Sequence, residues 1–433
     1  MTRKPIYCLL LILLIAMQSV CHVSAAAFTG ATLMSESAVL MDGETGQILF
    51  EKEMHRRMYP ASITKIMTAT LALERGRPND KITMSYDAVH SIARGSSHIA
   101  LIPDEELTLE QALYALALTS ANDAANGIAE HIGGSMEDFS ALMNERARQA
   151  GALRTNFVNA HGLYNVNHYT TAHDMARITL AAIKHPAFAE IFGSLIYDIP
   201  PTNLQPQQRT LRSTNYMLMG RYKYEGAIAA KTGWTRQSQH TLMTVAERDG
   251  RTLIAVVMRS GGRRDRWEDM TALLDYGFAG FTKVSFAAGE LGQGEMFTDR
   301  AFSCLVPNAL TKEDIEITYV TQPGANGGTS ARAVFTLKAS GFLADLGELE
   351  MELPAALPAV AGATRQERTR EGNTAVLPWG LGAAGLLLLC LVLLRLLKKK
   401  KRRPRRKVAG SVIIRLNQTP AGYALHGGRR RRR

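Results

Sequence analysis

Residues 59–70 read Tyr-Pro-Ala-Ser-Ile-Thr-Lys-Ile-Met-Thr-Ala-Thr, with a serine and a lysine three positions apart after a proline. Pro60 favours the first turn of a helix, so Ser62 and Lys65 are expected to share one face and to touch. A lysine held there away from water shifts toward its neutral form and can take the proton of Ser62, which activates the hydroxyl as a nucleophile. Taken alone the pattern is weak, because a helix-capping serine beside a solvated lysine explains it as well.

A second pattern follows the apolar run at residues 113–118. Ser120 and Asn122 stand two positions apart among small residues and are predicted to point into a cleft. The alternative is a capping serine at a helix start, followed by a turn. Ser213-Thr214-Asn215 matches the same pattern but lies in arginine-rich, loop-like sequence, so Ser120 and Asn122 are the preferred candidates.

A third pattern lies at residues 231–235, after the apolar stretch Ala227-Ile-Ala-Ala. A cation and hydroxyls on an edge strand can hold a substrate carboxylate by charge-assisted hydrogen bonds, and a glycine lets the substrate approach the backbone. An ordinary strand end with a surface lysine is the alternative. The candidate substrate-binding residues here are Lys231, Thr232, Gly233, Trp234 and Thr235.

The order of predicted elements favours an α/β domain followed by a small all-β domain. Strands are expected at both ends of the first segment, with helices inserted between them and a hairpin around Arg248-Asp-Gly-Arg251. From about Val284, period-two alternation with glycine-rich turns predicts further strands. The predicted strands are 37–52 (two around a turn), 241–246, 253–258, 315–320, 331–337 and 346–353, and the predicted helices follow Pro60 and span 109–131, 138–150 and 267–281.

Both ends of the chain carry apolar segments that indicate export. Residues 1–25 have the basic start, apolar run and small residues of a signal peptide, with an uncleaved anchor as the alternative. Residues 377–397 are long and apolar enough for a transmembrane helix, and the basic tail 398–433 is expected in the cytoplasm by the positive-inside rule. We therefore expect a single-pass cell-membrane protein whose other domains lie outside the cytoplasm.

The net charge of +12 is not a nucleic-acid signal. Fifteen lysines and arginines fall in residues 398–433, and Arg3, Lys4 and Arg395 lie in the two apolar segments. Subtracting these eighteen cations leaves about −6 for the rest of the chain, a field that repels nucleic acid. The exported part contains one cysteine, Cys304, and no paired Cys/His spacing, so neither an intramolecular disulfide nor a metal or cofactor is expected.

The predicted organisation has six segments. A catalytic domain that carries the three motifs and an all-β domain follow the signal peptide, and an Ala/Pro-rich, then polar stalk joins them to the membrane helix. The predicted bounds are 1–25, 26–283, 284–355, 356–376, 377–397 and 398–433.

Together, the three motifs in this order resemble those of the low-molecular-mass penicillin-binding proteins that are D-alanyl-D-alanine carboxypeptidases. The likeness extends to residues 157–163 and 167–171, and it runs from about Ser37 to Leu353. It implies a DD-peptidase/β-lactamase-like catalytic domain, with an antiparallel sheet and a helical subdomain. It also implies that the β domain presents this catalytic domain away from the membrane.

The resemblance implies a role for each candidate. Ser62 attacks the carbonyl between the last two D-alanines of a peptidoglycan stem peptide, and Lys65 is the general base. Ser120, linked to Lys231, relays a proton to the departing D-alanine, and Asn122 binds the peptide backbone. Lys231, Thr232 and Thr235 receive the terminal carboxylate, while the N–H groups of Ser62 and Trp234 form the oxyanion hole. β-Lactams are expected to acylate Ser62 and to leave slowly.

Some alternatives stay open. Residues 236–240 read Arg-Gln-Ser-Gln-His where the family usually has a small, glycine-containing stretch, which puts substrate preference and deacylation rate in doubt. A β-lactamase would use the same motifs but needs a further carboxylate; a scaffold would keep the fold without activity, and a transpeptidase or endopeptidase would share every motif. Arg429–Arg433 either binds anionic lipid or only marks topology. Oligomeric state and any vegetative or sporulation role are not predicted.

Overall fold

The computed structural model describes residues 33–292, 296–323, 329–338 and 345–353. The predicted signal peptide, stalk, membrane helix and basic tail lie outside the described residues, so those four segments stay predictions. Within the described part, no helix combines the length and the apolar character that crossing a bilayer requires.

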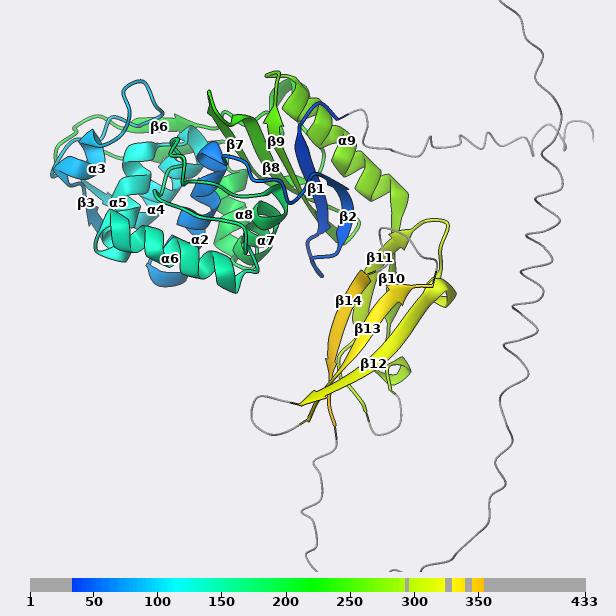
Figure 1. The fold of residues 1–433 in the computed structure, drawn as a ribbon. Helices are drawn as coiled ribbons and strands as arrows, with labels where there is room; N and C mark the ends of the chain where they lie inside the picture. Colours follow the sequence, from blue (N-terminus) through cyan, green and yellow to red (C-terminus); the bar gives the residue numbers. More distant parts are fainter. Residues whose placement is uncertain (1–32, 293–295, 324–328, 339–344, 354–433) are drawn as a thin grey trace, which may run out of the picture. The chain divides into compact units, whose positions relative to one another are not determined.

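A five-stranded antiparallel sheet organises the first part of the chain (Figure 1). Its order is β2-β1-β9-β8-β7, so strands from the two ends of this segment lie side by side. The α/β prediction is confirmed. The strands are β1 (Ser37–Asp42), β2 (Ile48–Lys52), β7 (Ala227–Thr235), β8 (Gln239–Arg248) and β9 (Arg251–Ser260), and short two-stranded sheets pair β3 (Lys81–Thr83) with β4 (Glu106–Thr108) and β5 (Ile196–Ile199) with β6 (Arg209–Arg212).

Alternating strand residues give this sheet two apolar faces. Val39 and Met41 of β1 join the core formed with the helices inserted between β2 and β7. Ala38 and Leu40 point the other way and pack with α9 (Asp265–Gly280), which lies along the opposite face. This is the period-two pattern of a strand covered on both sides. The predicted β8–β9 hairpin is confirmed, and its Asp249-Gly250 turn has two positive φ angles, as a type I′ turn requires.

The inserted helices form one subdomain. Residues 109–131 are mostly helical as predicted, but Ser120 interrupts them with a left-handed backbone at φ 59°. A π-helical turn at Ala115–Thr119 precedes this break and α5 follows it, so the serine is set apart from both helices. The helices are α2 (Lys65–Arg75), α3 (Tyr86–His90), α4 (Leu109–Tyr114), α5 (Asn122–Gly133), α6 (Met136–Gln149), α7 (Ala172–Ala182) and α8 (Pro186–Gly193).

Strands make up most of the described residues that follow α9. A two-stranded sheet joins β10 (Phe281–Phe286) to β11 (Phe302–Pro307), and a three-stranded sheet has the order β12-β13-β14. Their shared core includes Phe302 stacked on Phe335 with ring centroids 3.7 Å apart. The strand predictions at 315–320, 331–337 and 346–353 correspond to β12 (Ile315–Pro323), β13 (Thr329–Leu337) and β14 (Asp345–Met351). β10 itself begins at Phe281, three residues before the predicted start of the β domain.

Candidate active site

Ser62 lies in a single 3₁₀ turn, Ala61–Thr64, that leads directly into α2. Ala61 adopts φ +50°, a left-handed conformation that is strained for a residue with a side chain. Gly162, at φ +88°, lies so close that a Cβ on it would come within 1.9 Å of the Ala61 carbonyl oxygen. The turn that presents the nucleophile is therefore held in place by a glycine from the loop before α7.

The edge strand β7 lies against the same turn. A Cβ added to Gly233 would come within 2.8 Å of the Ser62 backbone nitrogen. Thr241 of β8 supports the approach, because its hydroxyl donates to the Pro60 carbonyl over 2.9 Å. Gly233 is thus needed for close packing of strand and nucleophile turn, and the Ser62 N–H lies next to the backbone of the Lys-Thr-Gly segment.

Lys65 is completely buried beneath Ser62. Its Nζ lies 3.4 Å from Ser62 Oγ, 2.6 Å from Asn122 Oδ1 and 2.7 Å from the His161 carbonyl oxygen. Burial, and then the positive charge of Lys231, hold the Lys65 pKa well below its usual range. A neutral amine donates two hydrogen bonds and keeps a lone pair, so Lys65 can hold Asn122 and His161 and still accept a proton from Ser62.

Lys231 is the second buried lysine of the site. It is 2% exposed, and burial lowers its pKa to about 7. Its Nζ donates to the neighbouring Thr232 carbonyl over 3.4 Å, a long and weak bond. Two buried ammonium groups repel each other, so the pair favours loss of a proton near neutral pH.

Ser120 and Asn122 have different surroundings. Asn122 begins α5, and its side chain bonds Lys65 as described above. Ser120 Oγ is buried without a hydrogen-bond partner among the described residues, so the expected link to Lys231 is not formed here. An unpaired hydroxyl in a strained left-handed residue is typical of a functional position, because folding alone gives no reason to keep it.

These residues surround a cleft of about 590 Å³. Of the predicted site residues, Ser62, Ser120, Thr232, Gly233 and Trp234 line it, whereas Lys65, Asn122 and Lys231 are buried. Trp234 is 59% exposed, so it presents its ring on the open side. The remaining lining residues are Ser97, Thr119, Thr214, His240, Arg263 and Arg266.

Thr235 lies apart from this lining. Its hydroxyl is 2.8 Å from Ser238 Oγ, and Ser238 Oγ also accepts a bond from the Thr235 N–H over 2.9 Å. Gln239 then takes φ +53°, the kind of backbone that glycine adopts easily. Residues 236–240 differ from the usual family sequence, yet Gln239 adopts the backbone conformation that a glycine would have. The Thr235 hydroxyl is hydrogen-bonded to Ser238 within this turn.

Three cleft residues with titratable side chains were missed from the sequence: His240, Arg263 and Arg266. A signal was present, because Arg263, Arg264 and Arg266 cluster at the start of α9, where the helix dipole disfavours cations. Arg266 is only 8% exposed, and its Nη1 donates to His240 Nδ1 over 2.7 Å. Three cations at one helix N-terminus are an unusual pattern, and it could have drawn attention to this part of the cleft.

Two buried histidines, His161 and His168, lie in the loop at residues 157–171. The Val158 N–H donates to His168 Nδ1 over 3.1 Å, so the ring carries its proton on Nε2 and donates to the Thr64 hydroxyl over 2.8 Å. Burial, followed by the charge of Lys65, lowers the pKa of both His161 and His168 to about 3. Both rings are neutral at ordinary pH, and the His168 ring holds the nucleophile turn through Thr64.

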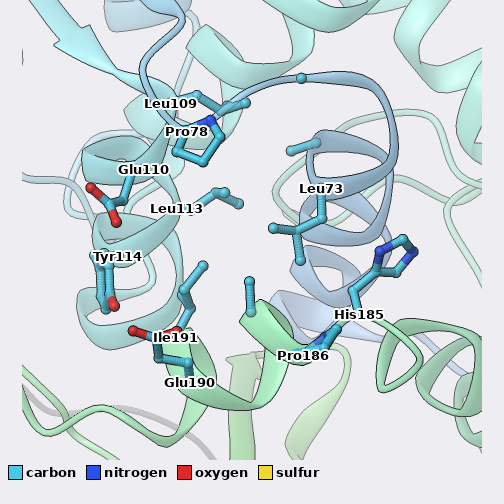
Figure 2. Close-up of a pocket in the computed structure, with 13 residues that line it drawn as sticks. Leu73, Pro78, Leu109, Glu110, Leu113, Tyr114, His185, Pro186, Glu190 and Ile191 are labelled. Carbon is cyan, nitrogen blue, oxygen red and sulfur yellow. The ribbon is translucent and has the colours of Figure 1, made fainter.

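A smaller and more enclosed cavity of about 240 Å³ lies elsewhere, between α2, α4 and α8 (Figure 2). Leu73, Leu113 and Ile191 give it apolar walls, and the carboxylates of Glu110 and Glu190 lie on one side. It contains no residue of the three motifs. The chemistry therefore belongs to the wider cleft at Ser62. In the described part of the chain, no group of three His, Cys, Asp or Glu side chains is placed to hold a metal ion.

Comparison with known proteins gives a family match for this part of the chain. The family model described as D-alanyl-D-alanine carboxypeptidase, peptidase S11, matches residues 22–261. The D-alanyl-D-alanine carboxypeptidase DacF of Bacillus subtilis is 34% identical over 57% of this chain, but the alignment spans only 62% of that relative's length. The D-alanyl-D-alanine carboxypeptidase of Streptomyces sp. strain K15 is 30% identical, with 91% of its length covered.

Solved structures give the same result. Penicillin binding protein 5 from Haemophilus influenzae superposes with a TM-score of 0.63 at 25% identity, covering 74% of this chain and 96% of the other. The Streptomyces K15 DD-transpeptidase superposes with a TM-score of 0.53 at 29% identity, covering 57% and 98%. These matches confirm the predicted penicillin-binding-protein fold. The chain belongs to the peptidase S11 family of D-alanyl-D-alanine carboxypeptidases.

Proposed function

We propose that this chain is a serine-type carboxypeptidase that removes the terminal D-alanine from peptidoglycan stem pentapeptides. The observation that carries the proposal is the buried Lys65 amine, held 3.4 Å from Ser62 Oγ with its pKa well below the usual range. Family membership supports the substrate, which is a peptide ending in D-Ala-D-Ala. The reaction serves maturation of the cell wall and needs no cofactor.

Acylation starts with transfer of the Ser62 proton to neutral Lys65. The Ser62 oxygen attacks the carbonyl carbon of the penultimate D-alanine, and the carbonyl oxygen takes up negative charge. We assign the backbone N–H of Ser62, which lies beside Gly233, and the backbone N–H of Trp234 as the two donors that stabilise this oxyanion. The carbon–nitrogen bond then breaks, and the amine of D-alanine leaves with a proton.

Ser120 is the assigned carrier of that proton. Ser120 lines the cleft, its hydroxyl has no partner among the described residues, and Lys231 has a pKa of about 7. A lysine that gains and loses a proton near neutral pH can replace the proton that Ser120 gives away. Formation of a Ser120–Lys231 bond on substrate binding is part of this proposal.

The terminal carboxylate is assigned to the side of the cleft that holds Arg266 and Thr232. Arg266 is a largely buried guanidinium, and the described residues supply no carboxylate to pair with it. A substrate carboxylate would neutralise this charge by bonds stronger than those between neutral groups. Since β7 is the last strand of the sheet order, the peptide is expected to bind along its free edge as an extended strand.

Hydrolysis of the acyl-enzyme requires Lys65 first to release to bulk water the proton that it took from Ser62. Neutral Lys65 then takes a proton from the attacking water and returns it to the Ser62 oxygen as the ester bond breaks, which frees the shortened peptide. None of the residues that line the cleft is an aspartate or a glutamate. The nearby carboxylate of Asp123 is buried and accepts bonds from the backbone N–H groups of Ile99 and Leu101. A β-lactamase normally has a carboxylate that activates the deacylating water, so this cleft favours slow release of penicillin and therefore a carboxypeptidase.

The proposal includes a location outside the cytoplasm, on the cell membrane. The sequence supports it by the signal-peptide pattern of residues 1–25 and the apolar segment 377–397, with the basic tail inside. Protease added to intact spheroplasts is expected to remove the domain that contains Ser62. A membrane-bound fragment that carries the basic tail 398–433 should remain. Protection of the whole chain would contradict this location.

The first test is intact-mass spectrometry of the full chain, purified in detergent and treated with benzylpenicillin. A lasting adduct of one penicillin is expected, and a Ser62→Ala variant should give none. If no adduct forms and the penicillin remains intact, the chain is a scaffold. If no adduct is found but the penicillin has been hydrolysed, the chain is a β-lactamase. Incubation with a D-Ala-D-Ala peptide should release free D-alanine, whereas capture of the acyl group by an added amine in preference to water would indicate a transpeptidase.

A further inference from the structure

His240 stands where the β7–β8 hairpin opens into the active-site cleft. It faces Trp234 across the hairpin, and the pairing of β8 with β9 shifts register between His240 and Leu242. The extra residue of this bulge lies on β9, where Arg259 has a φ of +57°, and bulges are frequent beside active sites. β8 keeps its regular alternation, so His240 lies on the same face as Leu242, which packs with α9, and the imidazole lines the cleft within reach of Arg266.

The hydrogen bond between His240 and Arg266 fixes how the imidazole is protonated. A guanidinium has only N–H donors, so Arg266 Nη1 must donate and His240 Nδ1 must accept across their 2.7 Å separation. The ring is therefore neutral and carries its proton on Nε2. Burial, and then the charges of Arg266 and Arg263, lower the His240 pKa to about 4, which keeps this form over the ordinary pH range.

Arg266 depends on this contact because few other groups of the protein hold it. Its Nε is buried without a hydrogen-bond partner, and its guanidinium lies over the Trp267 ring at 4.4 Å. No carboxylate of the described residues pairs with it. A cation left in this state is available for an external anion, and its direction is set by the neutral acceptor beside it.

We propose that His240 is a positioning residue that aims Arg266 at the free C-terminal carboxylate of the substrate, and so makes the enzyme select peptide acids. The proposal rests on the carboxypeptidase function assigned above. The Thr235 hydroxyl, which the family resemblance assigns to this carboxylate, is engaged with Ser238 in this chain. The His240–Arg266 pair therefore supplies the donor side of the carboxylate pocket, and an uncharged imidazole does so without adding a second buried cation.

Binding in a Ser62→Ala background tests this inference without catalysis. The dissociation constants of a D-Ala-D-Ala peptide acid and of its C-terminal amide are compared for three chains: the Ser62→Ala parent, and the parent carrying His240→Leu or His240→Asn. Asparagine places an amide oxygen near the position of Nδ1, so it can still accept from Arg266, whereas leucine cannot. Thermal denaturation of each chain verifies folding.

The parent is expected to prefer the acid. A hydrogen bond to a charged group corresponds to roughly 10- to 100-fold in affinity, so His240→Leu should reduce the acid/amide preference by about that factor. His240→Asn should stay within about 3-fold of the parent, and amide binding should hardly change. In the active enzyme the same substitution to leucine should raise KM with little change in kcat, since it removes binding rather than chemistry.

Two results would overturn the inference while leaving the proposed function intact. One is an unchanged acid/amide preference in His240→Leu, and the other is an equal loss of acid and amide binding, which would mean a general structural role. A parent that does not distinguish acid from amide would contradict carboxylate recognition as a whole. Failure of the proposed function itself is read separately, from absence of a penicillin adduct and of D-alanine release in the chain that retains Ser62.

Discussion

Two parts of the active site differ in how far their polar groups are bonded within the protein. In the buried layer (Lys65, Asn122 and His161), the amine of Lys65 already holds the asparagine oxygen and the histidine carbonyl. In the open wall (Trp234, His240 and Arg266), the guanidinium has one neutral partner and an unpaired Nε. We infer that the polar groups whose hydrogen bonds are already formed within the protein determine the reactivity of Ser62. The polar groups that still lack partners determine which substrate binds. The two parts should therefore respond differently to substitution.

The largest effect is expected from Lys65 in the buried layer. Lys65→Met removes the general base, and the rate of acylation by penicillin should fall by about 10²–10⁴-fold. Lys65→Arg is the control, because arginine keeps a charge and donors but does not deprotonate in proteins. Both variants should be slow in stopped-flow acylation. Substantial activity in the arginine variant would show that a neutral base at position 65 is not required.

A large structural effect is expected where the buried layer meets the nucleophile turn. Gly162→Ala places a Cβ against the Ala61 carbonyl in a left-handed residue, so unfolding free energy should fall by about 3–5 kcal/mol, with slow acylation. Gly134→Ala is the matched control, since its φ of +79° is similar but no atom lies within 4 Å, and about 1–2 kcal/mol is expected. Equal losses in urea denaturation would mean that close packing at Gly162 contributes nothing.

In the open wall, substitution of Arg266 should raise stability where substitution of Gly162 lowers it. Arg266→Leu removes a largely buried cation that lacks a carboxylate partner, so the free protein should gain about 1 kcal/mol or more in stability. The same change should raise the KM for a D-Ala-D-Ala peptide by roughly 10- to 100-fold. Arg264→Leu, at an exposed neighbour, should change neither quantity much. A destabilised Arg266→Leu protein with normal KM would reverse the distinction between the two parts.

Electrostatic coupling between the lysines gives a smaller, pH-dependent effect. The positive charge of Lys231 lowers the Lys65 pKa, so Lys231→Met should let that pKa rise. Lys65 would then remain protonated to higher pH, and the acidic limb of the acylation–pH profile should move to higher pH. The position of the limb, rather than the maximum rate, is the readout. A limb that stays in place or moves to lower pH would exclude this coupling.

The smallest effect concerns the turn that leads into the open wall. Gln239 has a φ of +53°, so Gln239→Gly should relieve strain and stabilise the protein by up to about 1 kcal/mol in thermal denaturation. Gln237→Gly, at a neighbour without positive φ, should instead destabilise by about 0.5–1 kcal/mol. If both substitutions destabilise, the turn is not strained at Gln239.

The fold was largely predictable because its strands alternate clearly. Leu40 and Met41 point to opposite faces, and Asp249-Gly250 encodes the hairpin turn, so both features can be read locally. The break at Ser120 was less accessible, since the apolar run before it continues as a π turn that no helical period reveals. The strands β10 and β11 escaped separate prediction because their partner residues meet only in three dimensions.

The candidate site was predictable in its buried layer and incomplete in its open wall. Ser62, Lys65 and Asn122 stand in short motifs, and the structure brings them into contact. Arg266 and His240 lie on different elements and meet only in the folded domain, so no spacing along the chain predicts their contact. Thr235 was predicted from its motif to bind the substrate carboxylate, but its hydroxyl is hydrogen-bonded to Ser238. The motif alone does not reveal this contact.

The central place of β9 has a consequence for the time at which the enzyme becomes active. β9 lies between β1 and β8, and the Ser35–Ser260 hydrogen bond joins residues that are 225 positions apart. Contacts of such long range form late, and none of them exists while the second half of the domain is still being synthesised. A growing chain that already contains Ser62 and Lys65 thus has no Lys-Thr-Gly strand beside them. Chains stopped before Arg251 should remain unlabelled by penicillin, so activity begins only when the domain is complete.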